Sequence, residues 1–380
     1  MNKRVLVLLS SPIASRTAGV SRYAREHGWH LMFQDRMGFA HPFDWMGDGV
    51  VATIRREPRS LAYLKHLSAL GVPIVDLTWD VPEFPCARVC ADHVAAGRLA
   101  AAHLAERNYR SRAFFTLDWG NNVRRRIWNG FTESAPAERW VFAEERPHVR
   151  WDDWGAVGRW LAGKFKAADK PLGILAYSQG EAVRLLDAAQ SLGIGVPDEL
   201  GVVCGNDDPI LLESQPVPVS AVDTDLERGA YEGAGLLDRL MAGEPPPAAP
   251  TVLPPRGVIA RRSTDATVAA DPLVRESLRR IGEHLADAFG PAQLAESVGV
   301  SRGTLDRRFA AELGRSASAE IRRRRLALAR RLLRETALPV AEIAVRAGFS
   351  SASHLGTAIR EETGLTPSGW RKSDIFTGRI

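Results

Sequence analysis

The sequence has few cysteines and no long apolar runs, and both shortages exclude whole classes of protein. Three of the 380 residues are cysteine (Cys86, Cys90 and Cys204), too few and too irregularly spaced for a disulfide framework. No segment approaches the roughly 20 apolar residues that span a bilayer. Residues 1–3 lead straight into the apolar run 5–9 without a signal-peptide cleavage pattern. We therefore expect a cytoplasmic protein that has no membrane partner.

Motifs for cofactors and metals are missing as well. No Walker-type GKS loop follows a strand, and no G-x-G-x-x-G lies at a strand-to-helix junction. Cys86, Cys90 and His93 could suggest zinc, but they lack the second pair of ligands that a zinc site needs. We expect no cofactor and no metal, and buried structural thiols instead.

One segment resembles an enzyme motif. Residues 176–180 nearly form the G-x-S-x-G nucleophile elbow of α/β-hydrolases, with Ser178 at the nucleophile position. That fold needs its acid and then its histidine after the serine, yet His284 and His354 are the only histidines beyond Ser178. Both lie in a basic C-terminal region. We expect no enzymatic activity, and a hydrolase using Ser178 remains a remote alternative.

The C-terminal hundred residues repeat the pattern of a helix-turn-helix unit. In each unit an apolar pair is followed by a glycine that can take a left-handed turn, then by a serine cap and a second helix. The first unit uses Leu294, Ala295, Gly299, Ser301, Leu305 and Phe309, and the second uses Ile343, Ala344, Gly348, Phe349, Ser350 or Ser351, Leu355 and Ile359. An all-α domain with two readers for adjacent major-groove segments is predicted.

Charge supports DNA as the partner. Residues 275–380 hold 19 Lys and Arg against 12 Asp and Glu, an excess of seven positive charges, whereas the whole chain has +5. The basic field is therefore local to this region. Residues 317–333 form one uninterrupted helical pattern, rich in arginine, that would fix the spacing of the two units. The arginines 322–325 are consecutive, so some of them must point away from any DNA.

The block from Gly299 to Arg371, which closes with Gly364 to Pro367 and Trp370, resembles the DNA-binding domain of AraC-type transcription regulators over residues 275–372. Arg302 and Arg307 would make bidentate contacts with guanine in the first groove segment. The first contact set comprises Arg302, Gly303, Thr304, Asp306 and Arg307, and a weaker second set comprises Ser351, Ala352, Ser353, His354 and Arg360. The second unit departs from the family at His354 and Thr357, so we expect it to bind DNA less strongly.

The first two thirds of the chain alternate short apolar runs with amphipathic helical stretches. The runs are 5–9, 31–33, 50–53, 73–76, 88–91, 113–117, 173–176, 202–205 and 219–222. This alternation predicts two doubly wound α/β lobes with parallel sheets. Ligands of such sheets bind beyond the carboxyl ends of the strands. The candidates there are Ser10, Ser11, Asp92, Trp119, Gln179, Asn206 and Asp207.

Several of these segments, such as CADHVAAGRLAAAHL and LGIGVPDELGVVCGNDD, look like the sugar-sensing domain of LacI-type repressors and periplasmic sugar-binding proteins. The resemblance implies that Asp92 and Asp207 bind sugar hydroxyls, and that one arginine among Arg124, Arg125 and Arg126 contacts the ligand. Trp45, Trp79, Trp119 and Trp128 could offer a flat face to the sugar.

A sensor of this kind joined to an AraC-type domain implies a homodimer that responds to a pentose, with D-xylose as the first candidate, and that activates sugar-catabolic genes. Its partners would be operator DNA and RNA polymerase, and it would be associated with the nucleoid when bound to DNA. Another sugar, a sugar acid or a sugar phosphate is the alternative effector; a phosphate would favour the arginines at 124–126. We predict a sensor at 1–262, a linker at 263–271 and the DNA-binding domain at 272–375.

Overall fold

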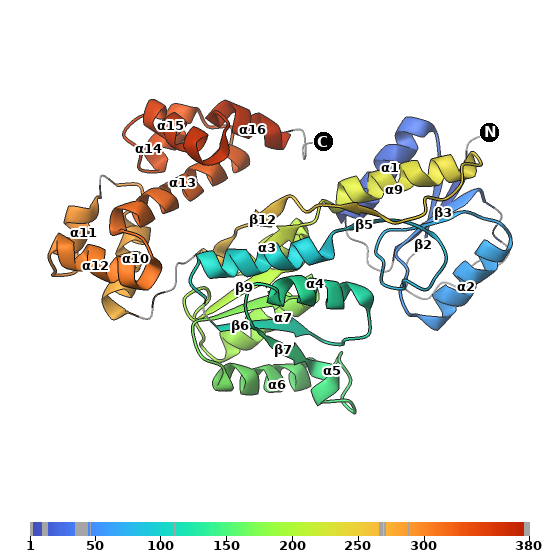
Figure 1. The fold of residues 1–380 in the computed structure, drawn as a ribbon, viewed down its shortest axis with the longest axis horizontal. Helices are drawn as coiled ribbons and strands as arrows, with labels where there is room; N and C mark the ends of the chain where they lie inside the picture. The colour runs from blue at the N-terminus through green and yellow to red at the C-terminus, as the bar shows by residue number, and fades with distance from the viewer. Residues whose placement is uncertain are drawn as a thin grey trace. The chain divides into compact units, whose positions relative to one another are not determined.

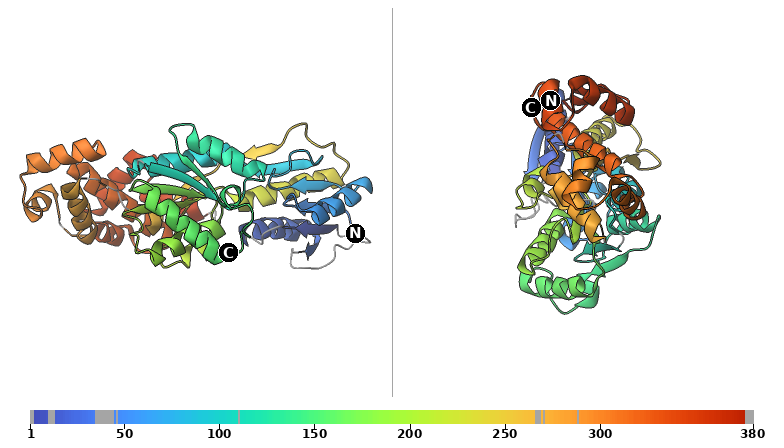
Figure 2. Two further views of the ribbon diagram at one scale, coloured as in Figure 1. Left: turned by 90° about the horizontal axis from the view of Figure 1, so that it is seen from below. Right: turned by 90° about the vertical axis from the view of Figure 1, so that its left-hand side faces the viewer.

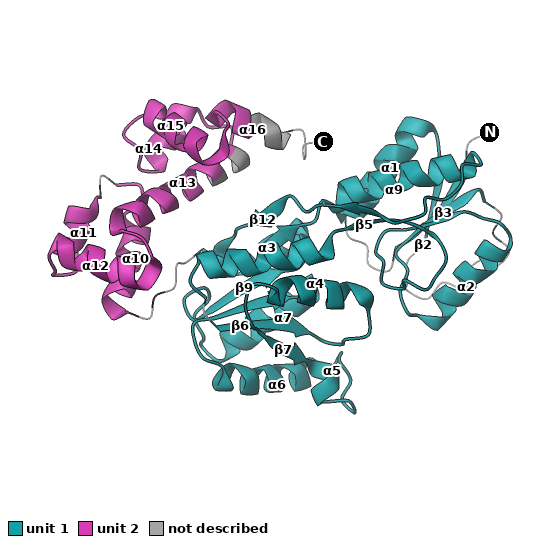
Figure 3. Cartoon of the chain, in the orientation of Figure 1, with its two compact units in different colours: residues 1–266 teal, residues 267–380 magenta. Residues whose placement is uncertain are grey.

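Alternating strands and helices build two α/β lobes before the chain becomes entirely helical (Figure 1). The computed structural model describes residues 3–9, 14–34, 45, 47–109, 111–265, 269, 271–287 and 289–375. The chain forms two compact units, Met1–Ala266 and Thr267–Ile380 (Figure 3). Among the described helices, none is both long and apolar enough to cross a membrane.

The first lobe is a parallel sheet in the order β11-β5-β4-β3-β1-β2. Its strands are β1 (Arg4–Leu8), β2 (His30–Gln34), β3 (Gly49–Ala52), β4 (Ile74–Asp76), β5 (Ala87–Ala91) and β11 (Thr251–Leu253). Every residue of β3, β4 and β5 is buried, because helices cover both faces of the sheet. The helices of this lobe are α1 (Ala14–His27), α2 (Pro58–Ala69) and α9 (Leu226–Met241).

The second lobe has a sheet in the order β12-β10-β9-β8-β6-β7, parallel except for the pair β10 and β12. Figure 2 shows the fold from two further directions. Its strands are β6 (Ser111–Thr116), β7 (Glu138–Val141), β8 (Leu172–Ala176), β9 (Leu200–Cys204), β10 (Ser220–Asp223) and β12 (Gly257–Ile259). Its helices are α3 (His93–Glu106), α4 (Asn122–Thr132), α5 (Phe142–Glu145), α6 (Trp154–Ala167), α7 (Gln179–Ser191) and α8 (Pro209–Glu213).

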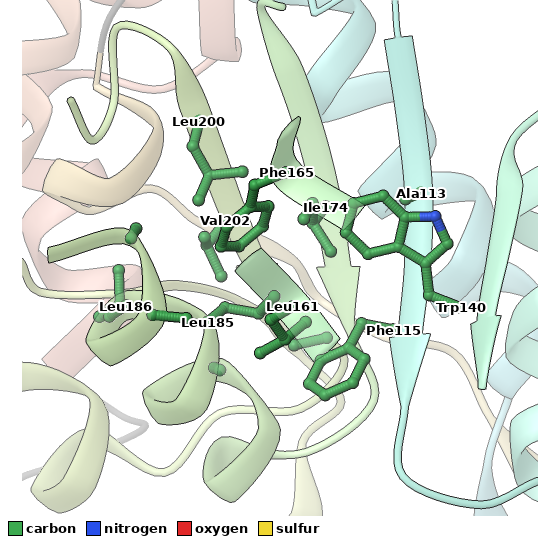
Figure 4. Close-up of a cluster of buried hydrophobic side chains, with 14 of the residues drawn as sticks. Ala113, Phe115, Trp140, Leu161, Phe165, Ile174, Leu185, Leu186, Leu200 and Val202 are labelled. Atoms are coloured by element: carbon green, nitrogen blue, oxygen red, sulfur yellow. The ribbon is translucent and has the colours of Figure 1, made fainter. Parts of the chain in front are cut away.

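One face of the second sheet forms a core with α6 and α7. Figure 4 shows Leu161 and Phe165 of α6 and Leu185 of α7 directed at side chains of the strands, including Phe115 and Ile174. The other face is covered by α3 and α4, which approach closely at Gly130: a Cβ there would lie 1.9 Å from the carbonyl oxygen of Val94. The glycine therefore lets α4 lie against α3, and this fixes the position of the arginines at 124–126.

The two predicted α/β lobes are present, and each apolar run of the sequence lies in or overlaps a strand. The chain passes between the lobes after β5, after β10 and after β11. The edge strand β7 was not predicted, because its four residues carry little apolar signal.

The sensor extends further along the chain than the linker prediction of 263–271 implied. Ser263 and Thr264 lie in a 3-10 turn, η1 (Arg262–Thr264), and neither is exposed. Ser263 Oγ donates a hydrogen bond to the carbonyl oxygen of Val202 (2.6 Å), and Thr264 Oγ1 lies 2.6 Å from Ser220 Oγ. These hydroxyls satisfy buried polar groups of the second sheet, so the two residues belong to the sensor.

The second unit is all α. Its helices are α10 (Pro272–Glu283), α11 (Pro291–Ser297), α12 (Arg302–Leu313), α13 (Ala317–Glu335), α14 (Val340–Arg346), α15 (Ala352–Thr363) and α16 (Pro367–Ile375). The long helix α13 takes part in two separate cores: Ile321 packs with Leu305 and Phe309, whereas Ala329 packs with Leu355. The predicted continuous helix between the two helix-turn-helix units is therefore present, and it supplies part of each core.

Candidate functional site

The segments that follow β4 in the first lobe and β6 in the second lobe meet at Asp80 and Asn122. Asp80 lies beyond the end of β4 in the first lobe, and Asn122 is the first residue of α4 in the second. The Asn122 side chain donates to the carbonyl oxygen of Trp79 (3.0 Å), and the amide of Val123 donates to Asp80 Oδ1 (3.4 Å). These bonds join the lobes directly, at the edge where ligands of such sheets bind.

Buried charges surround this junction. Asp80 is 2% exposed, and burial raises the pKa of its carboxyl although Arg55 and Arg124 act to lower it. Burial and the positive charge of Arg55 lower the pKa of Arg16 to about 10. Burial of the Tyr177 hydroxyl, followed by the charge of Asp80, raises the pKa of that tyrosine. A polar ligand placed here would meet charged groups that are largely removed from water.

The three consecutive arginines of α4 have different environments. Arg124 is buried: its Nε donates to Thr116 Oγ1 and its Nη1 to Asp118 Oδ1, both at 2.8 Å, and its guanidinium lies over the ring of Tyr177. Arg126 is half-buried, with its guanidinium 4.6 Å from the ring centre of Trp79. Arg125 is exposed. The helix register therefore directs the first and third arginines inward and the second into solvent.

Two of the predicted strand-end residues bond to each other, and a third begins a helix. Gln179 Nε2 donates to Asn206 Oδ1 (2.6 Å), which joins the ends of β8 and β9. Asp92 is the N-cap of α3 and accepts from the amides of Val94 and Ala95. Asp92 therefore opens the helix, and one of its oxygens, Oδ1, is engaged there.

Trp119 lies in an aromatic cluster with Phe114 and Trp128, and the guanidinium of Arg139 lies over its ring. This environment is typical of a structural tryptophan. Ser10 and Ser11, the other predicted strand-end residues, lie outside the described residues.

The structure gives Asp207 a protein partner. Its Oδ1 accepts from Arg261 Nη1 at 2.7 Å, and the same arginine binds Glu213. The side chains of Asp207 and Arg261 are 15% and 9% exposed. Because Arg261 lies beside η1, this pair ties the C-terminal end of the sensor to the end of β9, and Asp80 is the carboxylate found at the lobe junction instead.

Several residues of the junction were not predicted. Arg55 and Asp80 follow the ends of β3 and β4, so the rule that selected the other candidates could have found them. Tyr177 stands beside Ser178 in the segment that was considered as a nucleophile elbow. Arg16 comes from the first turn of α1, and no sequence motif marks it.

Ser178 has a structural role. Its hydroxyl and its amide both donate to Glu181 Oε2, at 2.9 and 2.8 Å, in a capping arrangement at the start of α7. Glu181 is buried and also accepts from Thr116 and from the amide of Leu117. The motif at 176–180 therefore builds a helix start.

A hollow in the first lobe lies apart from this junction. It has a volume of about 280 Å³ and is lined by residues that include Tyr23 and Tyr231. A second cavity, of about 10 Å³, is lined by residues that include Arg16 and Thr224. The second volume is that of roughly one water molecule. The strand ends and the buried charges, not the size of a hollow, mark the candidate ligand site.

The first reader helix of the C-terminal unit, that is, the recognition helix expected to enter the major groove, is α12. The turn glycine Gly299 has a φ of 72°, and Ser301 caps the helix by accepting from the amide of Thr304. Leu305 and Phe309 are buried, whereas Arg302, Gly303 and Arg307 are exposed. The predicted reading face is therefore open to a partner.

Asp306 differs from the rest of its predicted set. Its Oδ1 accepts from the amide of Ala317, which connects α12 to the first turn of α13. Its contact with Arg302 is long, at 3.8 Å. Asp306 thus positions the reader helix.

The second reader helix, α15, is built in the same way. Gly348 has a φ of 76°, and Ser351 accepts from the amide of His354 at 3.1 Å. Ser351, Ser353, His354 and Arg360 are exposed, and Ala352 is half-buried. The His354 ring is held by Ser350 Oγ at 3.1 Å and stands edge-on to Phe349.

Most described arginines of α13 serve the fold. Arg323 and Arg324, together with Arg315 of the preceding turn, bind the carboxylate of Glu320, which is fully buried. Arg325 donates to the carbonyl oxygens of Leu285, Asp287 and Phe289, and Arg322 binds Glu361. The arginine-rich helix α13 therefore holds the two helix-turn-helix units together, and the exposed arginines of α12 and α15 carry the candidate DNA contacts.

Both units match known families. Residues 101–264 match a periplasmic binding protein-like domain, and residues 294–373 match a helix-turn-helix domain. The chain is 28% identical to the xylose operon regulatory protein of Escherichia coli K12, over 93% of this chain and 92% of that protein. It is 25% identical to the protein of that name from Haemophilus influenzae, over 93% of each chain. The solved structure of the xylose-binding transcription activator xylR covers 98% of both chains, with 25% identity and a TM-score of 0.61.

These findings confirm both resemblances seen in the sequence. The chain is a DNA-binding transcription regulator that joins a periplasmic-binding-protein-like sensor to an AraC-type helix-turn-helix domain, the arrangement found in the xylose operon regulators.

Proposed function

We propose that this regulator binds a sugar between the lobes of its sensor, and that the bound sugar controls operator binding by the C-terminal unit. The observation that carries this proposal is the junction at Asp80 and Asn122, where polar groups from both lobes meet. A ligand that bonds to both lobes would stabilise one arrangement of the sensor over another. Ligand binding shifts such an equilibrium only as far as its affinities for the two arrangements differ.

The chemistry of the junction suits a polyhydroxylated ligand. Among the described residues, the carboxylate of Asp80 accepts one hydrogen bond, from the amide of Val123, at the long distance of 3.4 Å. Burial raises its pKa, and hydroxyl donors would offset that cost because they favour the charged form. The ring of Trp79, beneath Arg126, would offer an apolar face to the carbon side of a sugar.

D-Xylose is the first ligand to test, because relatives that align over nearly the whole chain are named for the xylose operon. Another pentose, a sugar acid or a sugar phosphate is the alternative. The regulator would act in the cytoplasm as a homodimer, with its paired C-terminal units on two operator half-sites. It would activate pentose-catabolic genes by bringing RNA polymerase to the promoter.

The experiment combines thermal unfolding with operator binding. D-Xylose, L-arabinose, D-ribose and D-lyxose are titrated against the full chain, and a bound ligand at a hundred times its Kd should stabilise the sensor by about 2.7 kcal/mol. Operator fragments obtained by in vitro selection report whether the same ligand changes DNA affinity. Asp80→Asn should abolish the response to ligand, whereas Asp152→Asn, at an exposed carboxylate of the second lobe, should retain it.

The proposal fails if no sugar, neutral or anionic, stabilises the chain or alters operator affinity. It also fails if Asp80→Asn responds to the ligand as the wild type does.

A further inference from the structure

The lobe junction contains more guanidinium groups than free carboxylates. The carboxylate of Asp76 is already used: its Oδ1 accepts from Ile54 and Thr78, and its Oδ2 lies 3.5 Å from Arg88 Nε. Asp118 is likewise held by Arg124. Asp80 is left as the buried carboxylate that faces Arg55 and Arg16.

The arginines that remain have few partners. In the described part of the chain, Arg55 Nε and Arg126 Nε are buried without a hydrogen-bond acceptor. The Arg16 side chain is 7% exposed, and burial together with the charge of Arg55 lowers its pKa to about 10. A buried donor that bonds to nothing costs its full desolvation free energy, and for a charged group this cost is larger. Such groups are stable when a ligand supplies the missing acceptors.

The positive charges also lie close enough to act on one another. Arg55 lowers the pKa of Arg16, and the positive charges of Arg16 and Arg126 lower the pKa of His93. His93 is buried, hydrogen-bonds to the backbone of Thr78, and has no partner at Nε2 among the described residues. Burial lowers the pKa of His93 to about 4, so the ring is neutral near pH 7; its one N–H is used at the backbone of Thr78, and Nε2 is an acceptor. The donors of the junction, with an excess of positive charge, are therefore its arginines.

We infer that the ligand of the sensor is an anionic sugar derivative, a polyhydroxylated carbon chain that carries a carboxylate or phosphate group. Arg16 and Arg55 would hold the anionic oxygens in charge-assisted hydrogen bonds, which are shorter and stronger than neutral ones. Asp80 would accept from the hydroxyls. This inference rests on the proposed function and narrows its class of ligand, because Arg16 and Arg55 carry two positive charges, Asp80 supplies one negative charge, and a neutral pentose would add none.

The test compares neutral and anionic ligands of one carbon skeleton. D-Xylose, D-xylonate and D-xylose 5-phosphate are titrated calorimetrically against the full chain at fixed ionic strength, with inorganic phosphate as a fourth arm. We expect one of the two anionic sugars to bind at least about tenfold more tightly than D-xylose, and the preferred one identifies the anionic group.

Two variants test which arginine binds the anionic group of the ligand. Arg55→Gln should reduce affinity for the anionic sugar at least about tenfold and affect D-xylose much less. Arg125→Gln is the matched control, because this arginine belongs to the same stretch of α4 as Arg124 and Arg126 but is exposed; it should change neither affinity. Added NaCl gives a further reading on the wild type, since it should weaken binding of the anion more than binding of the neutral sugar.

Each outcome decides one of the claims. If D-xylose binds as tightly as both anions and alters operator affinity, the inference is wrong and the proposed function stands. If inorganic phosphate alone binds as tightly as the sugar phosphate, the site recognises an anion without a sugar, and the inference is again wrong. If Arg55→Gln fails to fold, Arg16→Gln and the salt dependence of the wild type replace it. If no ligand of either class binds or changes DNA affinity, the proposed function itself fails.

Discussion

Replacing Glu320 with glutamine tests whether a buried carboxylate and its arginine partners stabilise α13, the helix that joins the two helix-turn-helix units. The Glu320 carboxylate lies near the start of α13 and is fully buried. Arg315 Nε donates to Oε2 (2.7 Å), Arg323 binds both oxygens, and Arg324 Nε donates to Oε1 (2.9 Å). Arg324 also donates to the carbonyl oxygen of Leu278 in α10. The substitution removes the negative charge from a site where three guanidinium groups converge.

The magnitude follows from the burial of the carboxylate. Removing one partner of a buried ion pair typically costs ~3–5 kcal/mol, because it leaves an uncompensated charge behind. The arginine side chains retain 14 to 35% exposure, so water relieves part of that cost. We expect a loss of about 3 kcal/mol, at the lower end of that range. Glu361→Gln is the control, since its pair with Arg322 is exposed and such pairs contribute ~0–1 kcal/mol.

Native-state hydrogen exchange is the assay. A loss of about 3 kcal/mol should speed exchange of the α13 amides roughly a hundredfold wherever exchange proceeds through opening of this unit. Amides of β8 and β9 in the sensor serve as an internal reference and should keep their protection. Equal, small losses of protection in Glu320→Gln and Glu361→Gln would show that the buried cluster does not stabilise α13.

Other predictions concern the same unit. Gly348→Ala should destabilise the C-terminal unit by ~1–3 kcal/mol, because φ is 76° and a Cβ would lie 2.3 Å from the carbonyl oxygen of Leu285. Urea unfolding should measure this loss and should show none for Gly303→Ala, since Gly303 is helical and has open space around it. Arg307→Ala should cost ~1–3 kcal/mol on the selected operator and much less on random DNA; equal losses on both would refute base recognition by this residue. Burial raises the pKa of Glu320, but hydrogen bonds from Arg323 and Arg324 outweigh burial and hold this pKa well below its usual range. The ionised carboxylate therefore stabilises the fold above the ordinary glutamate pKa of about 4.3, and this stability is lost as the pH falls through the lower pKa of the folded state. In an acid titration, the stability of Glu320→Gln should depend less on pH than that of the wild type.

Local patterns were sufficient for the fold because each element carries its own signal. The apolar runs that became β3, β8 and β9 are buried on both faces, and such strands are recognisable without knowledge of their neighbours. The turn glycines Gly299 and Gly348 are recognisable for the same reason, since a left-handed residue followed by a serine cap is a local requirement.

The role of an individual charged residue could not be obtained in this way. Asp207 follows a strand as the resemblance suggested, yet Arg261, 54 residues away in the chain, reaches its carboxylate. Arg124, Arg125 and Arg126 are consecutive and chemically identical, and only the packing of α4 against α3 at Gly130 decides which of them face inward.

The sequence by itself determined the class of protein, namely two α/β lobes followed by two helix-turn-helix units with a basic C-terminal field. Hydrophobic periodicity, caps and turn residues act over a few positions, so they can be read along the chain. The tertiary structure decided which charges remain unpaired. It brought Arg16, Arg55 and Asp80 together from three separate strand and helix ends. It also placed most described arginines of α13 in ion pairs and hydrogen bonds within the protein, such as those of Arg323 and Arg324 with Glu320. Electrostatic partners depend on distance in space and on burial, and neither quantity is written in the order of the residues.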